Sequence, residues 1–439
     1  MQKGKTILLI LMLISIVPIF FVAFNLLNIG AYDAEEMILF VGSFFGLIAF
    51  MIMWWQYVLG ARFSATIFTR DYLWVNKIHK LLGKYGFLLI LVHPILIYLD
   101  RIVYGLGITL PNLALDYDRH VFLGQLTIGV LGGVWLMSAI IRDKFSYRFW
   151  KRVHLFTYPL LFLIFLHSIA IGSFLSHSTS AWFSYYWYLL FIIFVLITVG
   201  RLLFQFGIIK AKYRVIEVNQ LTHDTFTLKL EPINNRIEPQ NGQFVYIQHS
   251  LTGESHPYTV SKFNPITGEL HISTKNLGKF SLELQSLKTG AIVYLDGPYG
   301  VFTKEAYLTS SPIVLIAGGI GITPFVRLIE YFVANPDKNP GITLFYGNKS
   351  EEDIAFKELV DTFQPEKFKV IHVLSLQESV PDGYEKGFIT ASLVKDYLTS
   401  LESRKFFLCG PPVMVAKLVP DLLNAGISKD SIYSEKFSM

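Results

Sequence analysis

Four histidines stand inside apolar stretches of the first half of the sequence, in two pairs of similar spacing. His79 and His93 bracket HKLLGKYGFLLILVH, and His154 and His167 bracket HLFTYPLLFLIFLH. A helix rises about 1.5 Å per residue, so the members of each pair would lie roughly 20 Å apart along one helix. Because an ionisable side chain is costly to bury in an apolar helix, each of these histidines is a candidate functional residue.

The spacing predicts that two facing helices bring His79 opposite His154 and His93 opposite His167. Imidazole is a common axial ligand of haem iron, and cofactor sites in helical bundles are built by side chains on facing helices. We therefore predict two haems, each bound by two histidines. A zinc site would need its ligands close together, and a proton relay would usually include Asp or Glu, of which these stretches have almost none. A single buried histidine can also serve only as a hydrogen-bonding group between helices.

The helical phase of the second pair is imperfect. At about 100° per residue, fourteen residues return nearly to the same helix face, whereas thirteen miss it by about 140°. Pro159 lies between His154 and His167. A proline kink or a π-bulge there would rotate the second half of the helix into phase.

Such pairs require a bundle of membrane helices. Of the 439 residues, 52% are hydrophobic and 16% charged, and the mean hydropathy is +0.46, which is too apolar for a soluble protein. Before about residue 210, six segments are long and apolar enough to cross about 30 Å of hydrocarbon. They span approximately residues 6–28, 37–59, 79–99, 121–141, 153–172 and 182–208. The first has too long an apolar run for a signal peptide, and we expect it to be a helix kinked at Pro18.

Basic residues are concentrated in alternate loops between these segments. Because Lys and Arg are enriched in cytoplasmic loops, we predict a multi-pass protein of the cell membrane, in contact with lipid and with both termini cytoplasmic. The net charge of +5 comes largely from this bias and indicates no nucleic-acid partner. The basic residues of these loops are Lys3, Lys5, Arg62, Arg70, Lys77, Arg142, Lys144, Arg148, Lys151, Arg152, Lys210, Lys212 and Arg214.

From about Tyr213 the sequence changes to short alternating strands, which predicts a small antiparallel barrel. Two motifs in this region suit a ligand. HPYTVS, from His256 to Ser261, offers an aromatic ring and hydroxyls on a strand; Tyr258 would fit a core position equally well. GKFS, from Gly278 to Ser281, is expected to open a helix whose backbone N–H groups suit a phosphate. The strand-like runs are YRVIEV, TFTLKL, FVYIQH, YTVSKF, LHISTK and AIVYLDG.

After DGPYG the pattern becomes strand, glycine turn and amphipathic helix, in PIVLIAGGIGITPFVRLIEYF. Glycines let the backbone approach a pyrophosphate, and the helix N-terminus attracts its charge. Further strands in GITLFYG, FKVIHVLS and KFFLCGPP alternate with helices, as in a doubly wound parallel sheet whose ligand crevice faces residues 346–349 and 409–412. The one cysteine, Cys409, excludes a disulfide within the chain and a cysteine metal cluster.

The order of these motifs resembles a known family. HPYT, GKFS, AGGIGITPF, CGPPVM and a terminal EKF look like the ferredoxin–NADP reductase superfamily. In the membrane half, Pro94 directly follows His93, and the motif WKRVH ends at His154. With these motifs and the six spans, the whole chain resembles the NADPH oxidase and ferric reductase transmembrane family. The resemblance implies a six-span α-helical haem domain at 1–210, an antiparallel β-barrel FAD domain at 211–306 and a doubly wound α/β NAD(P) domain at 307–439.

The resemblance also implies roles for residues of the barrel motifs. His256 would face the FAD pyrophosphate, Tyr258 would stack on the isoalloxazine, and Thr259 would act catalytically by hydrogen bonding near its N5 atom. The remaining residues implied to bind FAD are Pro257, Gly278, Lys279, Phe280 and Ser281.

In the NAD(P) domain the resemblance implies a pyrophosphate loop and a nicotinamide site. Cys409, with Gly410 and Pro411, would lie by the nicotinamide, and Phe437 would cover the flavin face, although Phe437 would serve equally well as a plain terminal anchor. Lys349 follows the second strand, where relatives that select NADPH carry Arg; Lys lacks the bidentate fork, so we expect a modest NADPH preference with NADH also used. The pyrophosphate loop would comprise Gly318, Gly319, Gly321, Thr323 and Pro324.

The expected activity is electron transfer from cytosolic NAD(P)H through FAD and two b-type haems to an extracytoplasmic acceptor. Oxygen, giving superoxide, is the first hypothesis, because the outer loops are short and Arg101 and His120 near that face would favour an anion, although they would equally suit haem propionates. Alternatives are a ferric or cupric chelate and an extracytoplasmic protein partner. Animal oxidases carry a further histidine one turn beyond the outer haem ligand, near the presumed oxygen site, and this chain has Ile97 at that position. No EF-hand precedes the first span, so no calcium regulation is expected.

Overall fold

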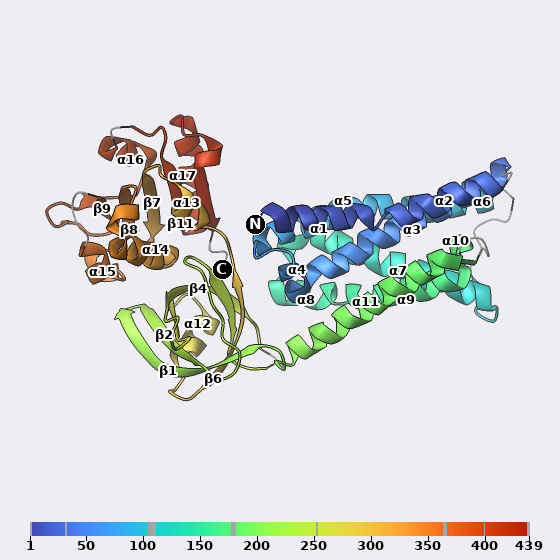
Figure 1. The fold of residues 1–439 in the computed structure, drawn as a ribbon, viewed down its shortest axis with the longest axis horizontal. Helices are drawn as coiled ribbons and strands as arrows, with labels where there is room; N and C mark the ends of the chain where they lie inside the picture. Colours follow the sequence, from blue (N-terminus) through green and yellow to red (C-terminus); the bar gives the residue numbers. More distant parts are fainter. Residues whose placement is uncertain are drawn as a thin grey trace. The chain divides into compact units, whose positions relative to one another are not determined.

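The structure is a computed structural model that divides into two compact units, Met1–Leu202 and Leu203–Met439. It describes residues 2–30, 33–103, 105, 111–176, 181–251, 253–362, 367–398 and 400–436. The first unit is α-helical, and the second holds a barrel and a parallel sheet (Figure 1).

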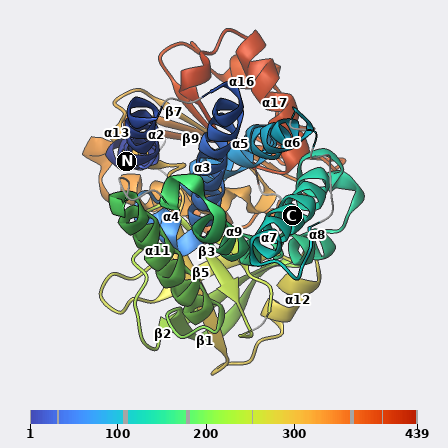
Figure 2. The ribbon, with the colours of Figure 1, turned by 90° about the vertical axis from the view of Figure 1, so that its right-hand side faces the viewer.

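Six helical stretches of the first unit are long and apolar enough to cross a membrane, which confirms the six predicted spans. Helix α3 packs against α5 and α6, and α7 packs against α9 (Figure 2). The helices are α1 (Gln2–Ile14), α2 (Val17–Ile29), α3 (Ala34–Gly60), α4 (Arg62–Thr66), α5 (Tyr72–Ile90), α6 (Val92–Val103), α7 (Asp116–Trp135), α8 (Tyr147–His154), α9 (Thr157–Ile171), α10 (Ser173–Ser176) and α11 (Ala181–Gln205), with a π-helix at Leu136–Ile140 and a 3₁₀ turn at Arg142–Lys144.

Three of the six spans are interrupted close to a proline. The first breaks between α1 and α2, before Pro18, as predicted for a kink there, and the third breaks between α5 and α6, before Pro94. In the fifth span, the carbonyl of Leu155 accepts a hydrogen bond from the Tyr158 amide, since Pro159 has no N–H to offer it. The helix therefore tightens just after His154, which is where the phase of the second histidine pair has to change.

Hydrophobic residues of the second unit close a six-stranded antiparallel barrel, as predicted. Alternate residues of each strand point inward and form a core that includes Tyr213, Phe226 and Val260. The strands are β1 (Ala211–Thr222), β2 (Thr225–Pro232), β3 (Phe244–Gln248), β4 (His256–Phe263), β5 (Leu270–Lys275) and β6 (Ile292–Tyr299), in the order β1-β2-β5-β4-β3-β6, with α12 (Lys279–Gln285) after β5.

The rest of the second unit is a six-stranded parallel sheet, which confirms the predicted α/β domain. Strand β7 lies between β8, which follows it in sequence, and β11, so the strand order reverses beside β7, and ligands bind at such switch points. The strands β10 and β12, at the sheet edges, were not predicted. The elements are α13 (Lys304–Leu308), β7 (Ile313–Gly318), α14 (Thr323–Ala334), β8 (Ile342–Asn348), α15 (Lys357–Asp361), β9 (Phe368–Leu374), β10 (Glu385–Lys386), α16 (Ala391–Tyr397), β11 (Lys405–Gly410), α17 (Pro412–Asn424) and β12 (Ile432–Lys436), with 3₁₀ turns at Gly319–Ile322, Pro336–Lys338, Glu351–Asp353 and Lys429–Ser431.

Candidate cofactor sites

The structure brings the four histidines of the first unit together in the two predicted pairs. The ring centroids of His79 and His154, here called the inner pair, are 6.2 Å apart. Those of His93 and His167, the outer pair, are 6.3 Å apart. A metal ion bound by one nitrogen of each ring, at about 2 Å from each, would separate the centroids by roughly 6 Å. Both pairs therefore have the spacing that a bis-histidine iron requires.

The outer pair is held by backbone carbonyls. Nδ1 of His93 is 2.8 Å from the Gly42 carbonyl oxygen, and Nδ1 of His167 is 2.8 Å from the carbonyl oxygen of His120. A carbonyl accepts only, so each Nδ1 carries the proton and donates, which leaves the Nε2 lone pair free to bind a metal. This is the arrangement in which a second group fixes the tautomer and orientation of a metal-binding imidazole.

The inner pair is packed among aromatic and backbone groups instead. The Trp150 ring stacks on His154 with 4.9 Å between centroids. The Gln56 side chain donates a 2.7 Å hydrogen bond to the His79 carbonyl. Among the described residues, neither Nδ1 of this pair has a partner in hydrogen-bonding geometry. The fold alone therefore does not fix the tautomer of the inner rings as it does that of the outer ones.

Glycines make room for the two imidazoles of the outer pair. A Cβ at Gly46 would lie 2.8 Å from Nδ1 of His93, and one at Gly124 would lie 2.7 Å from Cε1 of His167. At Gly60 the nearest His79 atom would be 3.5 Å away, in ordinary contact. Both pairs thus fit a haem in the separation of their rings, and the outer pair also fits it in tautomer and in the space around its rings.

In the barrel, the two predicted flavin motifs lie side by side. The rings of His256 on β4 and Phe280 on α12 are stacked, with 4.2 Å between centroids, and Tyr258 is nearly parallel to Phe280 at 6.3 Å. Burial raises the pKa of the Tyr258 phenol to about 12 despite a hydrogen bond to Thr274. His256, Tyr258 and Phe280 thus form an aromatic surface of the kind on which a planar ring system stacks.

The GKFS motif opens helix α12 as predicted, with Gly278 as the N-cap residue. The Ser281 hydroxyl accepts hydrogen bonds from the amides of Leu277 and Gly278 at 3.0 and 3.1 Å, so these two amides are already paired. Thr259 is buried, and because successive strand residues alternate in direction, it points away from Tyr258. Pro257 and Lys279 are exposed.

The glycine loop after β7 packs against the loop after β11. A Cβ at Gly321 would lie 2.3 Å from the Cys409 carbonyl oxygen, and one at Gly410 would lie 2.6 Å from Cε of Met414. A Cβ at Gly318 would meet Pro411 at 2.8 Å. These glycines are therefore required for the two loops to meet at the switch point of the sheet.

The rest of the glycine loop forms the predicted turn into a helix. Gly319 has a φ of +53°, a backbone conformation that favours glycine. The Thr323 hydroxyl donates to the Ile320 carbonyl at 3.0 Å. Pro324 lies in the first turn of α14, where its missing N–H costs no helical hydrogen bond.

The Cys409 thiol is buried in the hydrophobic core of the sheet. Burial, followed by the charge of Glu435, raises its pKa well above the ordinary value, so the thiol is neutral. Glu435 lies opposite Cys409 in the pairing of β11 with β12, and burial raises its pKa to about 7. The EKF motif at the end of the sequence gives no reason to expect a role for the Glu435 carboxyl, and only the pairing of β11 with β12 places it beside Cys409. Phe437 lies outside the described residues.

Lys349 is exposed directly after the carboxyl end of β8. The loop that follows is fixed by Asp353, whose Oδ2 atom accepts hydrogen bonds from the amide and hydroxyl of Ser350 at 3.0 and 2.8 Å. The Glu351 amide donates to the Gln377 side chain at 2.9 Å. Lys349 therefore stands at the sheet edge where a nucleotide is expected, on a loop with a defined backbone.

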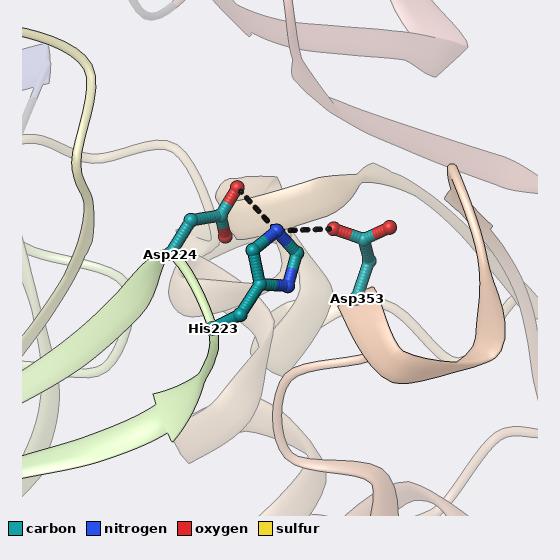
Figure 3. Close-up of side chains that lie close together, drawn as sticks. All are labelled: His223, Asp224 and Asp353. Atoms are coloured by element: carbon teal, nitrogen blue, oxygen red, sulfur yellow. Dashed lines mark ion pairs between the residues drawn. The ribbon is translucent and has the colours of Figure 1, made fainter.

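One further cluster joins the barrel to the sheet. Nε2 of His223 is 3.5 Å from an Asp224 oxygen and 3.8 Å from an Asp353 oxygen (Figure 3). The spacing is compatible with a metal ion, but the Lys275 ammonium is 2.7 Å from Asp224 and 3.9 Å from Asp353. Because that ammonium already neutralises both carboxylates, we interpret the cluster as a set of ion pairs between the barrel and the parallel-sheet domain.

Comparison with known proteins gives three family matches. Residues 45–165 match a family described as ferric reductase like transmembrane component, residues 212–303 an oxidoreductase FAD-binding domain, and residues 315–419 an oxidoreductase NAD-binding domain. The three regions follow one another in the order of the helical bundle, the barrel and the parallel sheet.

Individual relatives are similar over about half of the chain. NADH-cytochrome b5 reductase 2 of Kluyveromyces lactis is 32% identical over 215 residues, which are 45% of this chain and 70% of that protein. NADH-cytochrome b5 reductase 1 of Meyerozyma guilliermondii is 28% identical over 233 residues, 50% of this chain and 80% of that protein. Sulfhydrogenase 2 subunit gamma of Pyrococcus furiosus is 29% identical over 235 residues, 50% and 81% of the two chains.

Proposed function

This chain belongs to the NADPH oxidase and ferric reductase transmembrane family, and from that premise we propose that it is an NAD(P)H oxidase of the cell membrane that produces superoxide. It is a multi-pass membrane oxidoreductase with FAD-binding and NAD-binding domains. The observation that carries the proposal is the pairing of histidines at two levels of the bundle, at 6.2 and 6.3 Å, in one chain with a reductase half. Both termini are cytoplasmic in this proposal.

The bound groups would supply the redox chemistry: FAD takes two electrons as hydride and gives them up singly, and haem iron carries one electron at a time. The chain's own residues bind and orient these groups. His256, Tyr258 and Phe280 offer the aromatic surface for the flavin, the glycine loop after β7 admits the nucleotide pyrophosphate, and the four histidines hold the two irons.

The two imidazoles of the outer pair support oxygen as the acceptor. If His93 and His167 both hold the iron of a bound haem, an acceptor would have to receive its electron without binding the metal. Among the described residues of the outer side, no group of three His, Cys, Asp or Glu side chains lies close enough together to hold a ferric ion. Asp116 pairs with Arg119 at 2.7 Å, and Asp118 accepts from the Asn112 amide at 2.7 Å. A small neutral molecule needs no such ligands.

The names of the relatives support the use of NADH as well as NADPH. Two of them are NADH-dependent by name, and Lys349 supplies a cation near the expected 2′-phosphate without the fork of an arginine. We therefore propose a modest preference for NADPH, with NADH as a second substrate.

Reduction of cytochrome c by the purified protein with NADPH tests the acceptor. If superoxide is the product, superoxide dismutase abolishes most of the signal, because cytochrome c is then reduced only by the released anion. Full rates in the presence of dismutase, together with fast anaerobic reduction of ferric citrate, would assign a metalloreductase instead. Slow turnover with both small acceptors would point to an extracytoplasmic protein as the acceptor.

A further inference from the structure

Arg201, near the end of α11, is a cation with one side of its guanidinium group unused. Its Nη1 atom is buried and makes no hydrogen bond to any residue that the structure describes. No ion pair joins it to a described Asp or Glu. Arg201 as a whole is half-buried, but a buried donor of a charged group without a partner is costly, above all inside a membrane bundle, so the site around Nη1 suits an anion.

The other side of the guanidinium group is fixed on Tyr158. Nη2 of Arg201 donates a hydrogen bond to the Tyr158 hydroxyl, and the guanidinium carbon lies 3.7 Å from the centroid of the Tyr158 ring. Tyr57 packs edge-on against Tyr158, with 5.9 Å between centroids, and its hydroxyl is 2.6 Å from that of Thr198, one turn before Arg201. These contacts fix the direction in which Nη1 points.

The same contacts place Arg201 beside the inner histidine pair. Tyr158 follows His154 by four residues, in the first turn of α9 after the tightened turn that ends α8. Gly60 follows Tyr57 by three residues on α3, and a Cβ there would lie 3.5 Å from the His79 ring. Arg201 is close enough to interact electrostatically with both His79 and His154.

We propose that Nη1 of Arg201 binds a carboxylate of the group held by His79 and His154, namely a propionate of the inner haem. The proposal rests on the proposed function, which supplies that haem. A guanidinium group matches a carboxylate in charge and geometry, and a haem carries its two carboxylates at one edge of the ring. The pair satisfies the buried Nη1 and neutralises a charge that the haem would otherwise bring into the bundle.

Lys80 provides a matched control. It also interacts electrostatically with His79, but it is exposed, so the helical bundle does not enclose its charge. If a nearby positive charge alone mattered, removing Lys80 and removing Arg201 would have similar effects. If a direct contact matters, only Arg201 should.

The experiment uses the purified full-length chain with a His167→Ala substitution, in which the remaining haem is that of the inner pair. Arg201→Met, Arg201→Lys and Lys80→Met are added singly. The haem midpoint potential is measured by spectroscopic redox titration, and haem loss is followed by transfer to excess apomyoglobin. Pyridine haemochrome of the unsubstituted protein, with an expected two haems per chain, is measured first.

We expect Arg201→Met to lower the haem midpoint potential, because removing a positive charge favours the ferric state. It should also speed haem loss tenfold or more, because a hydrogen bond between charged groups is lost. Arg201→Lys should retain most of the potential, and Lys80→Met should change neither the potential nor the rate of haem loss.

The proposal is overturned if Arg201→Met leaves the potential and the rate of haem loss unchanged, or if Lys and Met at position 201 have equal effects. If Arg201→Met cannot be purified, Arg201→Lys is compared directly with Lys80→Met, and the proposal is overturned if the two variants have the same potential and the same rate of haem loss. Absence of haem from the unsubstituted protein would instead refute the proposed function.

Discussion

At the scale of single residues, the outer histidines differ from the inner ones in what orients them. His93 and His167 each donate from Nδ1 to a backbone carbonyl, whereas the inner rings are held by packing. Arg201, as we propose, holds the group that the inner rings bind. The outer pair is therefore held ready for a metal by the fold alone. The inner pair depends more on the group that it binds.

Changing either outer histidine should remove one haem and leave the flavin. His93→Ala and His167→Ala each take away one of the two imidazoles that an iron needs, so pyridine haemochrome should fall from two haems per chain to one while bound FAD is unchanged. His120→Ala is the matched control, because it keeps the backbone carbonyl that orients His167. Two haems in either outer variant would refute the pairing.

Lys349 should affect the two nucleotides differently. Its exposed ammonium can pair with the 2′-phosphate that only NADPH carries, and an exposed ion pair contributes about 1 kcal/mol or less. Lys349→Ala should therefore lower kcat/KM for NADPH by up to about fivefold and leave that for NADH nearly unchanged. Steady-state kinetics with both nucleotides measure this, with Lys417→Ala, an exposed lysine on α17, as the control. An equal loss for both nucleotides would show that Lys349 does not contact the phosphate.

At the scale of elements, α7 approaches the outer pair through a glycine. A Cβ at Gly124 would lie 2.7 Å from Cε1 of His167, whereas nothing lies within 4 Å of a Cβ at Gly129, one and a half turns further along the same helix. The His167 imidazole therefore leaves no room for an alanine at position 124, whereas position 129 has room for one.

The two glycines therefore make a paired test. Gly124→Ala should displace His167 and weaken the outer haem roughly tenfold or more, since overpacking costs about 1–3 kcal/mol. Gly129→Ala should leave haem content unchanged or stabilise the helix slightly. Haem stoichiometry and thermal loss of the haem absorbance measure both. Equal behaviour of the two variants would mean that α7 does not approach His167 as closely as the structure shows.

At the scale of the whole molecule, the single cysteine makes the proposed orientation measurable. Cys409 is buried, so a membrane-impermeant maleimide should barely label the unsubstituted protein. Leu113→Cys, in the loop before α7, should be labelled in intact cells, and Lys288→Cys, exposed in the barrel, only after lysis. The reverse pattern would contradict cytoplasmic termini.

The sequence by itself determined the classes of element and their order. Apolar length predicted six spans, alternation predicted the barrel strands, and the glycine turn predicted where the parallel sheet begins, because each of these patterns is local in the chain. The pairing of His79 with His154 and of His93 with His167 was also predicted, since two helices with equal histidine spacing have few ways to face each other.

Only the tertiary structure decided what surrounds those residues. The break after His154, the carbonyls of Gly42 and His120, the stacking of Phe280 on His256 and the pairing of Glu435 with Cys409 all join segments that are distant in sequence or depend on how one turn is hydrogen-bonded. Arg201 appeared in the sequence as one more basic residue at the end of a span. Its importance follows from the burial of Nη1 and from the lack of a hydrogen-bond partner for that atom among the described residues. A local sequence pattern predicts neither property, because both depend on which helices pack around Arg201.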